Sequence, residues 1–217
     1  GRSKEEIWEA LQRKETYATS GTRMLLWFNL IQNNQKTPMG SVIELNQNPT
    51  FEVKAMGSFE QKEGCPEDAY NALGEERVSE LCFDECYNPS DKRKFIQRIE
   101  VIKVLPQEFN DQKVDDRIMD PWKVHYCNPD ENGCSFIFQD EDFAKDSKDA
   151  SYYVRAIEVP TPQINVKGGV CTFDDDGNCI EYKLCTQDWR HPRDVESCSE
   201  IDEHRAWSSP IYVDFAT

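Results

Sequence analysis

Residues 95–105, Phe-Ile-Gln-Arg-Ile-Glu-Val-Ile-Lys-Val-Leu, are rich in β-branched and aliphatic side chains. This content favours a long β-strand, which Pro106 ends because proline cannot donate a hydrogen bond to a neighbouring strand. Residues 50–56 alternate apolar and polar side chains, as a half-buried strand does. The same criteria predict strands at 24–30, 135–138, 152–159 and 211–215, and a small hairpin with arms at 171–173 and 180–182.

Polar, turn-rich segments separate these strands, and that arrangement is typical of two stacked antiparallel sheets. We therefore expect a mainly β fold, an antiparallel β-sandwich with one short N-terminal helix and disulfide-tied loops. Residues 68–81 are a second, less regular helical candidate, and the polar residues 183–206 are expected to form a long loop.

The N-terminal helix is predicted over residues 4–14. Ser3 and Glu6 have the spacing of a capping box, in which each side chain binds a backbone N–H group of the other residue. Ile7, Trp8 and Leu11 then mark one apolar face. A single helix of this length cannot bury such a face by itself, so we expect the face to pack against another part of the protein.

The charge balance narrows the choice of partners. The 217 residues include 41 acidic and 25 basic side chains, for a formal net charge of -16. Such a surface repels phosphate backbones and anionic lipids, so neither nucleic acid nor a membrane is an expected partner. Cations or a basic protein fit better, although the charge can also serve solubility alone. No apolar run approaches the roughly 20 residues of a membrane-spanning helix.

Nine cysteines are present, and several flank turn sequences. Closing a turn brings its flanks within disulfide distance. We predict disulfides between Cys127 and Cys134, between Cys171 and Cys179, and, from weaker turn signals, between Cys185 and Cys198. The remaining three cysteines allow a fourth pair and leave one thiol, with connectivity open: Cys65, Cys82 and Cys86.

This cysteine pattern indicates an oxidising compartment, so the expected location is secreted or periplasmic. The alternative is a set of reduced, buried cysteines in a cytosolic protein.

The acidic turn Asp174-Asp175-Asp176-Gly177-Asn178 places several oxygen ligands together, which suits calcium. The candidate ligands are Asp174, Asp175, Asp176 and Asn178. The EF-hand spacing is not met, because Cys185 stands where the loop would require a glutamate. A solvated hairpin tip is therefore the favoured interpretation, and no cofactor is expected in this chain.

Two further groups of side chains, one acidic and one aromatic, are candidates for a function. Asp140, Glu141 and Asp142 are expected to be solvated loop charges. Trp122 and Trp189 adjoin predicted loops, where exposed aromatic rings can stack on sugars, although core or loop anchoring is the more common role.

Two motifs lie far apart in the chain: Tyr-Ala-Thr-Ser-Gly-Thr-Arg at 17–23 and Arg-Ala-Trp-Ser-Ser-Pro-Ile-Tyr at 205–212. Together with residues 5–11 they resemble bacterial proteins of domain-of-unknown-function family 3604. Those proteins are similar to metallohydrolases of the PHP (polymerase and histidinol phosphatase) superfamily. Shorter stretches agree in the same order, at 38–40, 96–103, 152–155 and 160–162.

The resemblance implies that a metal-binding barrel, with His-x-His and Asp-x-His motifs, precedes a C-terminal β domain. Neither motif occurs here, so no metal ligand carries over, and divalent metals are expected in an upstream domain. Residues 1–23 would be the last barrel helix and a connecting segment, and residues 24–217 a C-terminal β-sandwich domain with cysteine-rich inserts. The candidate interdomain residues are Tyr17, Ser20 and Arg23.

The resulting expectation is a non-catalytic C-terminal β domain of a secreted PHP-like metallohydrolase, with the upstream barrel of the same protein as its partner. The alternative is an independent extracellular module that binds carbohydrate or protein. Arg23 has two interpretations of its own: it lies near a site for an anionic ligand, or it pairs with an acidic neighbour.

Overall fold

A computed structural model describes residues 3–82, 86–164, 170–183 and 199–216. The chain divides into two compact units, one of residues 1–158 with 205–217 and one of residues 159–204. No helix in the described part of the chain has the length and apolar character needed to cross a membrane.

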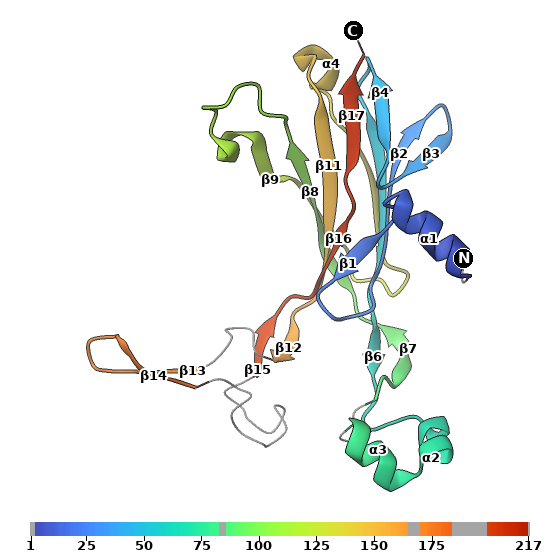
Figure 1. Cartoon of the computed structure of the whole chain (residues 1–217), viewed down its shortest axis with the longest axis vertical. Coiled ribbons are helices and arrows are strands. Elements are labelled where there is room, and N and C mark those ends of the chain that lie inside the picture. The colour runs from blue at the N-terminus through green and yellow to red at the C-terminus, as the bar shows by residue number, and fades with distance from the viewer. Residues whose placement is uncertain (1–2, 83–85, 165–169, 184–198, 217) are drawn as a thin grey trace. The chain divides into compact units, whose positions relative to one another are not determined.

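The first unit is built on two sheets (Figure 1). In the larger sheet, the central strand β11 pairs with β8 on one side and with β16 and β17 on the other. Strand β9 extends the sheet beyond β8, β1 pairs with β16, and β4 pairs with β17. The strands are β1 (Tyr17–Thr19), β4 (Val42–Leu45), β8 (Ile96–Val104), β9 (Ile118–Tyr126), β11 (Ala150–Glu158), β16 (Arg205–Ser208) and β17 (Ile211–Phe215).

The smaller sheet has four strands in the order β10-β5-β2-β3, and all its pairs are antiparallel. Phe51 of this sheet lies with its ring centroid 4.6 Å from that of Tyr152 in the larger sheet. One continuous apolar core therefore joins the inner faces of the two sheets. The strands are β2 (Leu25–Gln32), β3 (Gln35–Pro38), β5 (Thr50–Met56) and β10 (Cys134–Gln139).

The mainly β fold and its principal strands agree with the sequence prediction. One detail differs, because β4 and β17 pair in parallel, so the larger sheet is not wholly antiparallel. Strand β9 also escaped prediction. Asp120, Pro121 and Lys123 interrupt the apolar pattern that marks a strand. The proline is tolerated because β9 lies at an edge of the sheet, where it pairs with β8.

Four short helices accompany the sheets in the described part of the chain. They are α1 (Lys4–Gln12), α2 (Glu67–Leu73), α3 (Glu75–Cys82) and α4 (Phe143–Asp146), with a 3-10 turn η1 at Val114–Arg117. The capping box of α1 is present as predicted: Ser3 Oγ accepts the N–H of Glu6, and the Glu6 carboxylate accepts that of Ser3. The predicted helix at 68–81 is divided at Gly74, whose φ of 80° interrupts the helix. A two-stranded ribbon of β6 (Phe59–Gln61) and β7 (Pro89–Arg93) flanks α2 and α3 in sequence.

The second unit contains two antiparallel pairs, β12 with β15 and β13 with β14. The hairpin predicted around the acidic turn is the β13–β14 pair. The long loop predicted over 183–206 is wrong in part, because β15 and the start of β16 lie within it. Their backbones find strand partners that the polar local sequence does not reveal. The strands are β12 (Thr161–Ile164), β13 (Val170–Phe173), β14 (Cys179–Lys183) and β15 (Ser199–Asp202).

Candidate functional site

The segment that follows α1 is bound to the larger sheet through its backbone. Tyr17 lies in β1, and its hydroxyl donates to the carbonyl of Met24 at 3.0 Å. Ser20 exchanges two hydrogen bonds with Arg205, one through each backbone N–H group, and both are 2.9 Å long. These contacts determine where the next residues, Gly21 to Arg23, leave the sheet.

Arg23 does not pair with an acidic side chain in the described part of the protein. Its guanidinium carbon lies 3.7 Å from the centroid of the Tyr87 ring, which is a stacking distance. The N–H groups of a stacked guanidinium lie in the guanidinium plane and point past the aromatic ring, so they remain available to a ligand. Of the two interpretations of Arg23 left open by the sequence, the acidic pair is therefore not observed.

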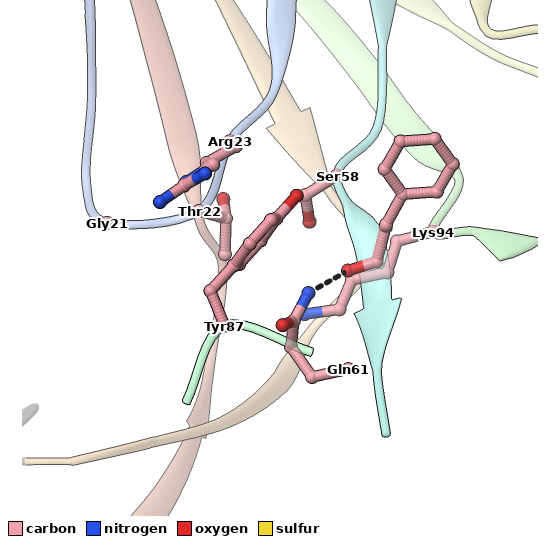
Figure 2. Close-up of a pocket in the computed structure, with 8 residues that line it drawn as sticks. Gly21, Thr22, Arg23, Ser58, Gln61, Tyr87 and Lys94 are labelled. Carbon is pink, nitrogen blue, oxygen red and sulfur yellow. Dashed lines mark hydrogen bonds between the residues drawn. The ribbon is translucent and has the colours of Figure 1, made fainter. Parts of the chain in front are cut away.

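Arg23 and Tyr87 line a pocket of about 280 Å³ in the first unit. Figure 2 shows the Tyr87 side chain between Arg23 on one side and Ser58 and Gln61 on the other. Lys94 comes from the segment that follows β7, and its backbone N–H donates to the carbonyl of Ser58. The lining residues are Gly21, Thr22, Arg23, Ser58, Phe59, Gln61, Tyr87 and Lys94.

Several polar atoms at this pocket lack partners among the described residues. Ser58 is 4% exposed, and its Oγ is buried without a hydrogen bond, as is the Oγ1 of Thr22. The Lys94 ammonium has no carboxylate partner in the described chain. Gln61 differs, because its amide nitrogen donates to the Phe59 carbonyl and its amide oxygen accepts the N–H of Asn88, each at 3.0 Å.

A buried carboxylate adjoins the pocket without lining it. Glu158 is completely buried at the end of β11, and its Oε1 accepts the backbone N–H of Ser58 at 2.5 Å. Its Oε2 has no hydrogen-bond partner among the described residues. Glu158 therefore holds the Ser58 backbone in place.

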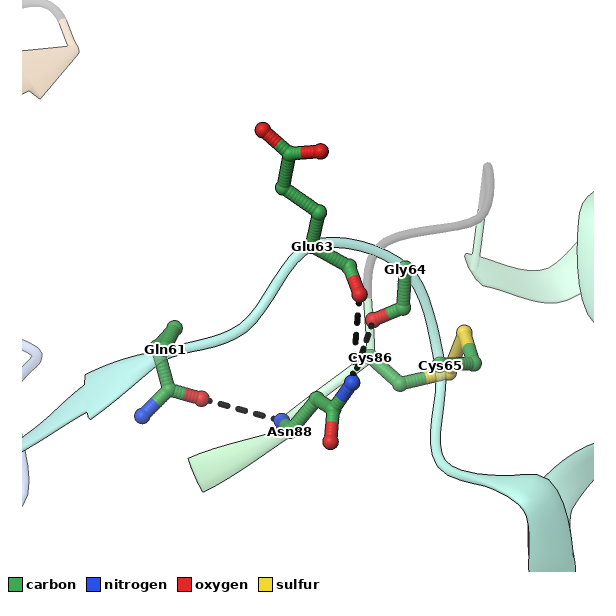
Figure 3. Close-up of a disulfide and its surroundings, with 6 residues drawn as sticks. All are labelled: Gln61, Glu63, Gly64, Cys65, Cys86 and Asn88. Carbon is green, nitrogen blue, oxygen red and sulfur yellow. Dashed lines mark hydrogen bonds between the residues drawn. A yellow bond between two sulfur atoms is a disulfide. The ribbon is translucent and has the colours of Figure 1, made fainter. Parts of the chain in front are cut away.

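Both chain neighbours of Tyr87 are anchored, and Figure 3 shows these neighbours, Cys86 and Asn88, with their partners. Cys86, the preceding residue, is bonded to Cys65. Asn88, the following residue, donates through its side-chain nitrogen to the carbonyls of Glu63 at 3.2 Å and Gly64 at 3.4 Å. The disulfide and these hydrogen bonds close the base of the insert that carries α2 and α3. Both neighbours of Tyr87 are therefore tied to residues 63–65.

The structure joins Cys127 to Cys134 and Cys171 to Cys179, the two pairs that flank turns. Cys82 is a free, half-buried thiol. Cys185 and Cys198 lie outside the described residues. Two groupings in the described chain have the proximity of metal ligands, and each contains a disulfide: Cys65, Cys82 and Cys86, and His125, Cys127 and Cys134.

The acidic turn has the geometry of an Asx turn. Asp174 Oδ1 accepts the N–H groups of Asp176 at 3.0 Å and Asn178 at 2.8 Å. Hydrogen bonds from the turn backbone, above all the one from the N–H of Asn178, lower the pKa of Asp174. Asp175, Asp176 and Asn178 are exposed. Calcium binding by these four residues stays a prediction, since the hydrogen bonds already account for the turn.

Trp122 and Asp140 both lie deeper than the sequence suggests. Trp122 is half-buried, with its ring centroid 5.9 Å from that of Tyr152 and 6.2 Å from that of Phe138. It packs at the edge of the core instead of forming an exposed platform, whereas Trp189 lies outside the described residues. Asp140 is 1% exposed, so its expected solvation is wrong. Burial is tolerated because Lys103 supplies an opposite charge.

Of the pocket residues, Arg23 was predicted from the sequence, whereas Ser58, Tyr87 and Lys94 were not. These residues belong to separate segments that no spacing rule links. Lys94 follows directly after Arg93, in a run of charges that resembles an ordinary solvated surface. A useful signal would have been the cysteines at 65 and 86, because their pairing fixes the position of Tyr87.

Comparison with known proteins finds one family whose sequence model matches the N-terminal part of the chain. Residues 1–63 match the sequence model of the family described as "Protein of unknown function (DUF3604)". The matched segment contains α1, the connecting residues and the part of the pocket formed by residues 21–23 and 58–61. No curated protein and no solved structure matches the chain.

Proposed function

We propose that this chain is the non-catalytic β domain of a secreted, PHP-like metallohydrolase and covers the metal-binding barrel of the same protein. The family match over residues 1–63 supports this proposal, because the resemblance to that family implies an upstream barrel. The barrel would hold the divalent metals. The three disulfides among the described residues favour an oxidising compartment.

The exposed face of α1 is the observation that carries the proposal. None of the helix residues is buried, and Ile7, Trp8 and Leu11 are 52%, 62% and 53% exposed. These three large apolar side chains form a patch on one short helix, and the exposure of such a patch to water is unfavourable. The barrel is the partner that the family resemblance implies for this face.

The helix is held firmly enough to present that face. Gly40 lies against its C-terminal end, where a Cβ atom would come within 2.5 Å of the carbonyl oxygens of Arg13 and Lys14. The N–H of Ser209 donates to the Thr16 carbonyl at 3.1 Å. Since the β domain anchors the end of α1, docking of the apolar face would orient the whole domain on its partner.

A binding experiment tests the proposal. The polypeptide encoded upstream of Gly1 is produced separately and titrated against this chain. We expect binding that Trp8→Ala weakens at least about ten-fold, the equivalent of losing one buried aromatic anchor. Val42→Ala is the matched control, because Val42 is also 62% exposed but lies on β4. Hydrolase activity is expected from the upstream polypeptide and not from this chain.

Two outcomes would overturn the proposal. The first is an upstream polypeptide without His-x-His and Asp-x-His motifs. The second is association that is indifferent to Trp8→Ala and Leu11→Ala. Either result would favour the alternative, an independent extracellular binding module, for which the pocket beside Tyr87 is the supporting observation.

A further inference from the structure

The pocket beside Tyr87 has a charge opposite to that of the protein as a whole. The chain carries a formal charge of -16, yet the pocket lining includes Arg23 and Lys94 and no acidic residue. An ionised Glu158 beside the pocket would offset only one of these two positive charges. The lining therefore keeps a net positive charge, which attracts an anion into the pocket.

The pocket also has more hydrogen-bond donors than acceptors to offer. Arginine and lysine side chains only donate, and the hydroxyls of Thr22 and Ser58 are free to donate because they have no partner in the described chain. The Gln61 amide is already engaged at both ends. Buried donors without partners are unfavourable, and a ligand rich in acceptor oxygens would satisfy them.

The segments that carry the donors are held in place before any ligand arrives. Arg23 stacks on Tyr87, and Tyr87 is fixed by the Cys65–Cys86 disulfide and the hydrogen bonds of Asn88. Glu158 holds the backbone of Ser58, and a hydrogen bond to the Ser58 carbonyl holds the backbone of Lys94. Preorganised donors lose little conformational freedom on binding, which favours affinity.

We propose that this pocket binds a small ligand through an oxyanion group, with Arg23 and Lys94 as the charged donors and the hydroxyls of Thr22 and Ser58 as neutral donors. Its volume of about 280 Å³ lies just below the usual range for ligand pockets, so the ligand is a compact molecule. This site is independent of the apolar face of α1, and either proposal can hold without the other.

Isothermal titration of the 217-residue chain at low ionic strength tests the site with three probes: inorganic phosphate, sulfate and acetate. We expect saturable binding of at least one probe, weaker at high salt. Phosphate or sulfate alone would identify a tetrahedral oxyanion as the ligand group, and acetate alone a carboxylate. Arg23→Gln and Lys94→Gln should each weaken binding at least about ten-fold, as expected for charge-assisted hydrogen bonds.

Lys92→Gln is the matched control, because Lys92 is an exposed lysine two residues from Lys94 and does not line the pocket. It should bind like the parent chain. Arg23→Lys keeps the charge but loses the planar fork, so an intermediate loss is expected and the test survives if Arg23→Gln fails to fold. The proposal is overturned if no probe binds saturably, or if Lys92→Gln weakens binding as much as Lys94→Gln does.

Discussion

Lys103 and Asp140 form an ion pair inside the β-sandwich, with 2.5 Å between Nζ and Oδ2 and with side chains that are only 5% and 1% exposed. Lys103 lies on β8 of the larger sheet, and Asp140 directly follows β10 of the smaller one. The hydroxyl of Tyr152 donates to the same carboxylate oxygen at 2.6 Å, and the N–H of Asp142 donates to the other at 3.2 Å. The pair thus links the two sheets through a carboxylate with three donors.

Breaking this pair from one side should be costly. Lys103→Met leaves the Asp140 carboxylate buried without its counter-charge, and we expect a loss of about 3–5 kcal/mol in the free energy of unfolding. Combining Lys103→Met with Asp140→Asn removes both charges, so the double variant should lose less than the sum of the single variants. Urea unfolding followed by circular dichroism measures all three. Strictly additive losses would contradict a direct interaction.

Tyr152 should make stability depend on alkaline pH. Burial, reinforced by the hydrogen bond to Asp140, raises the pKa of Tyr152 above its ordinary value. The unfolded chain ionises this phenol near pH 10, whereas the folded chain keeps it protonated. The stabilisation is therefore complete below about pH 10 and declines above it. Unfolding free energies between pH 8 and 11 should fall more steeply for the parent than for Tyr152→Phe. Parallel curves would show that Tyr152 does not contribute.

The Cys127–Cys134 disulfide joins the two sheets, because Cys127 follows β9 and Cys134 opens β10. Replacing both cysteines by alanine should reduce the free energy of unfolding by about 2–3 kcal/mol, the value expected for a short closed loop. Thermal unfolding of the variant beside the parent measures the loss. The Cys171–Cys179 double variant is the control: that disulfide lies in the other unit, so melting of the sandwich should change little.

Within the cluster of three cysteines at the insert, Cys82 should react with iodoacetamide while Cys65 and Cys86 do not. The reagent modifies a thiol but not a disulfide. Peptide mass spectrometry after alkylation without reductant identifies the labelled residue, and Cys82→Ser should abolish this label. A label on Cys65 or Cys86 in the folded parent would mean that the cluster uses another pairing.

Gly40 should tolerate no side chain. Its φ is 92°, and a Cβ atom would lie 2.5 Å from two carbonyl oxygens at the end of α1. Gly40→Ala should cost at least about 1–3 kcal/mol through backbone strain alone, with the steric clash in addition. Thermal unfolding measures the loss, and Gly21→Ala is a useful comparison. Gly21 also has a positive φ, but a Cβ there would meet nothing within 4 Å, so its loss should be smaller.

Local sequence accounts well for the strands and for α1. Residues 50–56 and 211–215 alternate in a way that a single buried face imposes, and the structure has strands at those same residues. The capping box of Ser3 and Glu6 is likewise a local interaction. Cysteines on either side of a turn could be paired from sequence for the same reason, because the turn itself brings them together.

The pocket and the buried ion pair could not be found in this way. Lys103 lies within strand β8, and no residue near it in the sequence indicates that it pairs with Asp140 across the sandwich. Arg23 and Tyr87 meet because a disulfide, the hydrogen bonds of Asn88 and the pairing of β6 with β7 close the insert. The sequence by itself determined the short-range features, whose interactions span a few residues. Tertiary structure decided which distant charges and donors meet, because sheet packing and crosslinks bring them together.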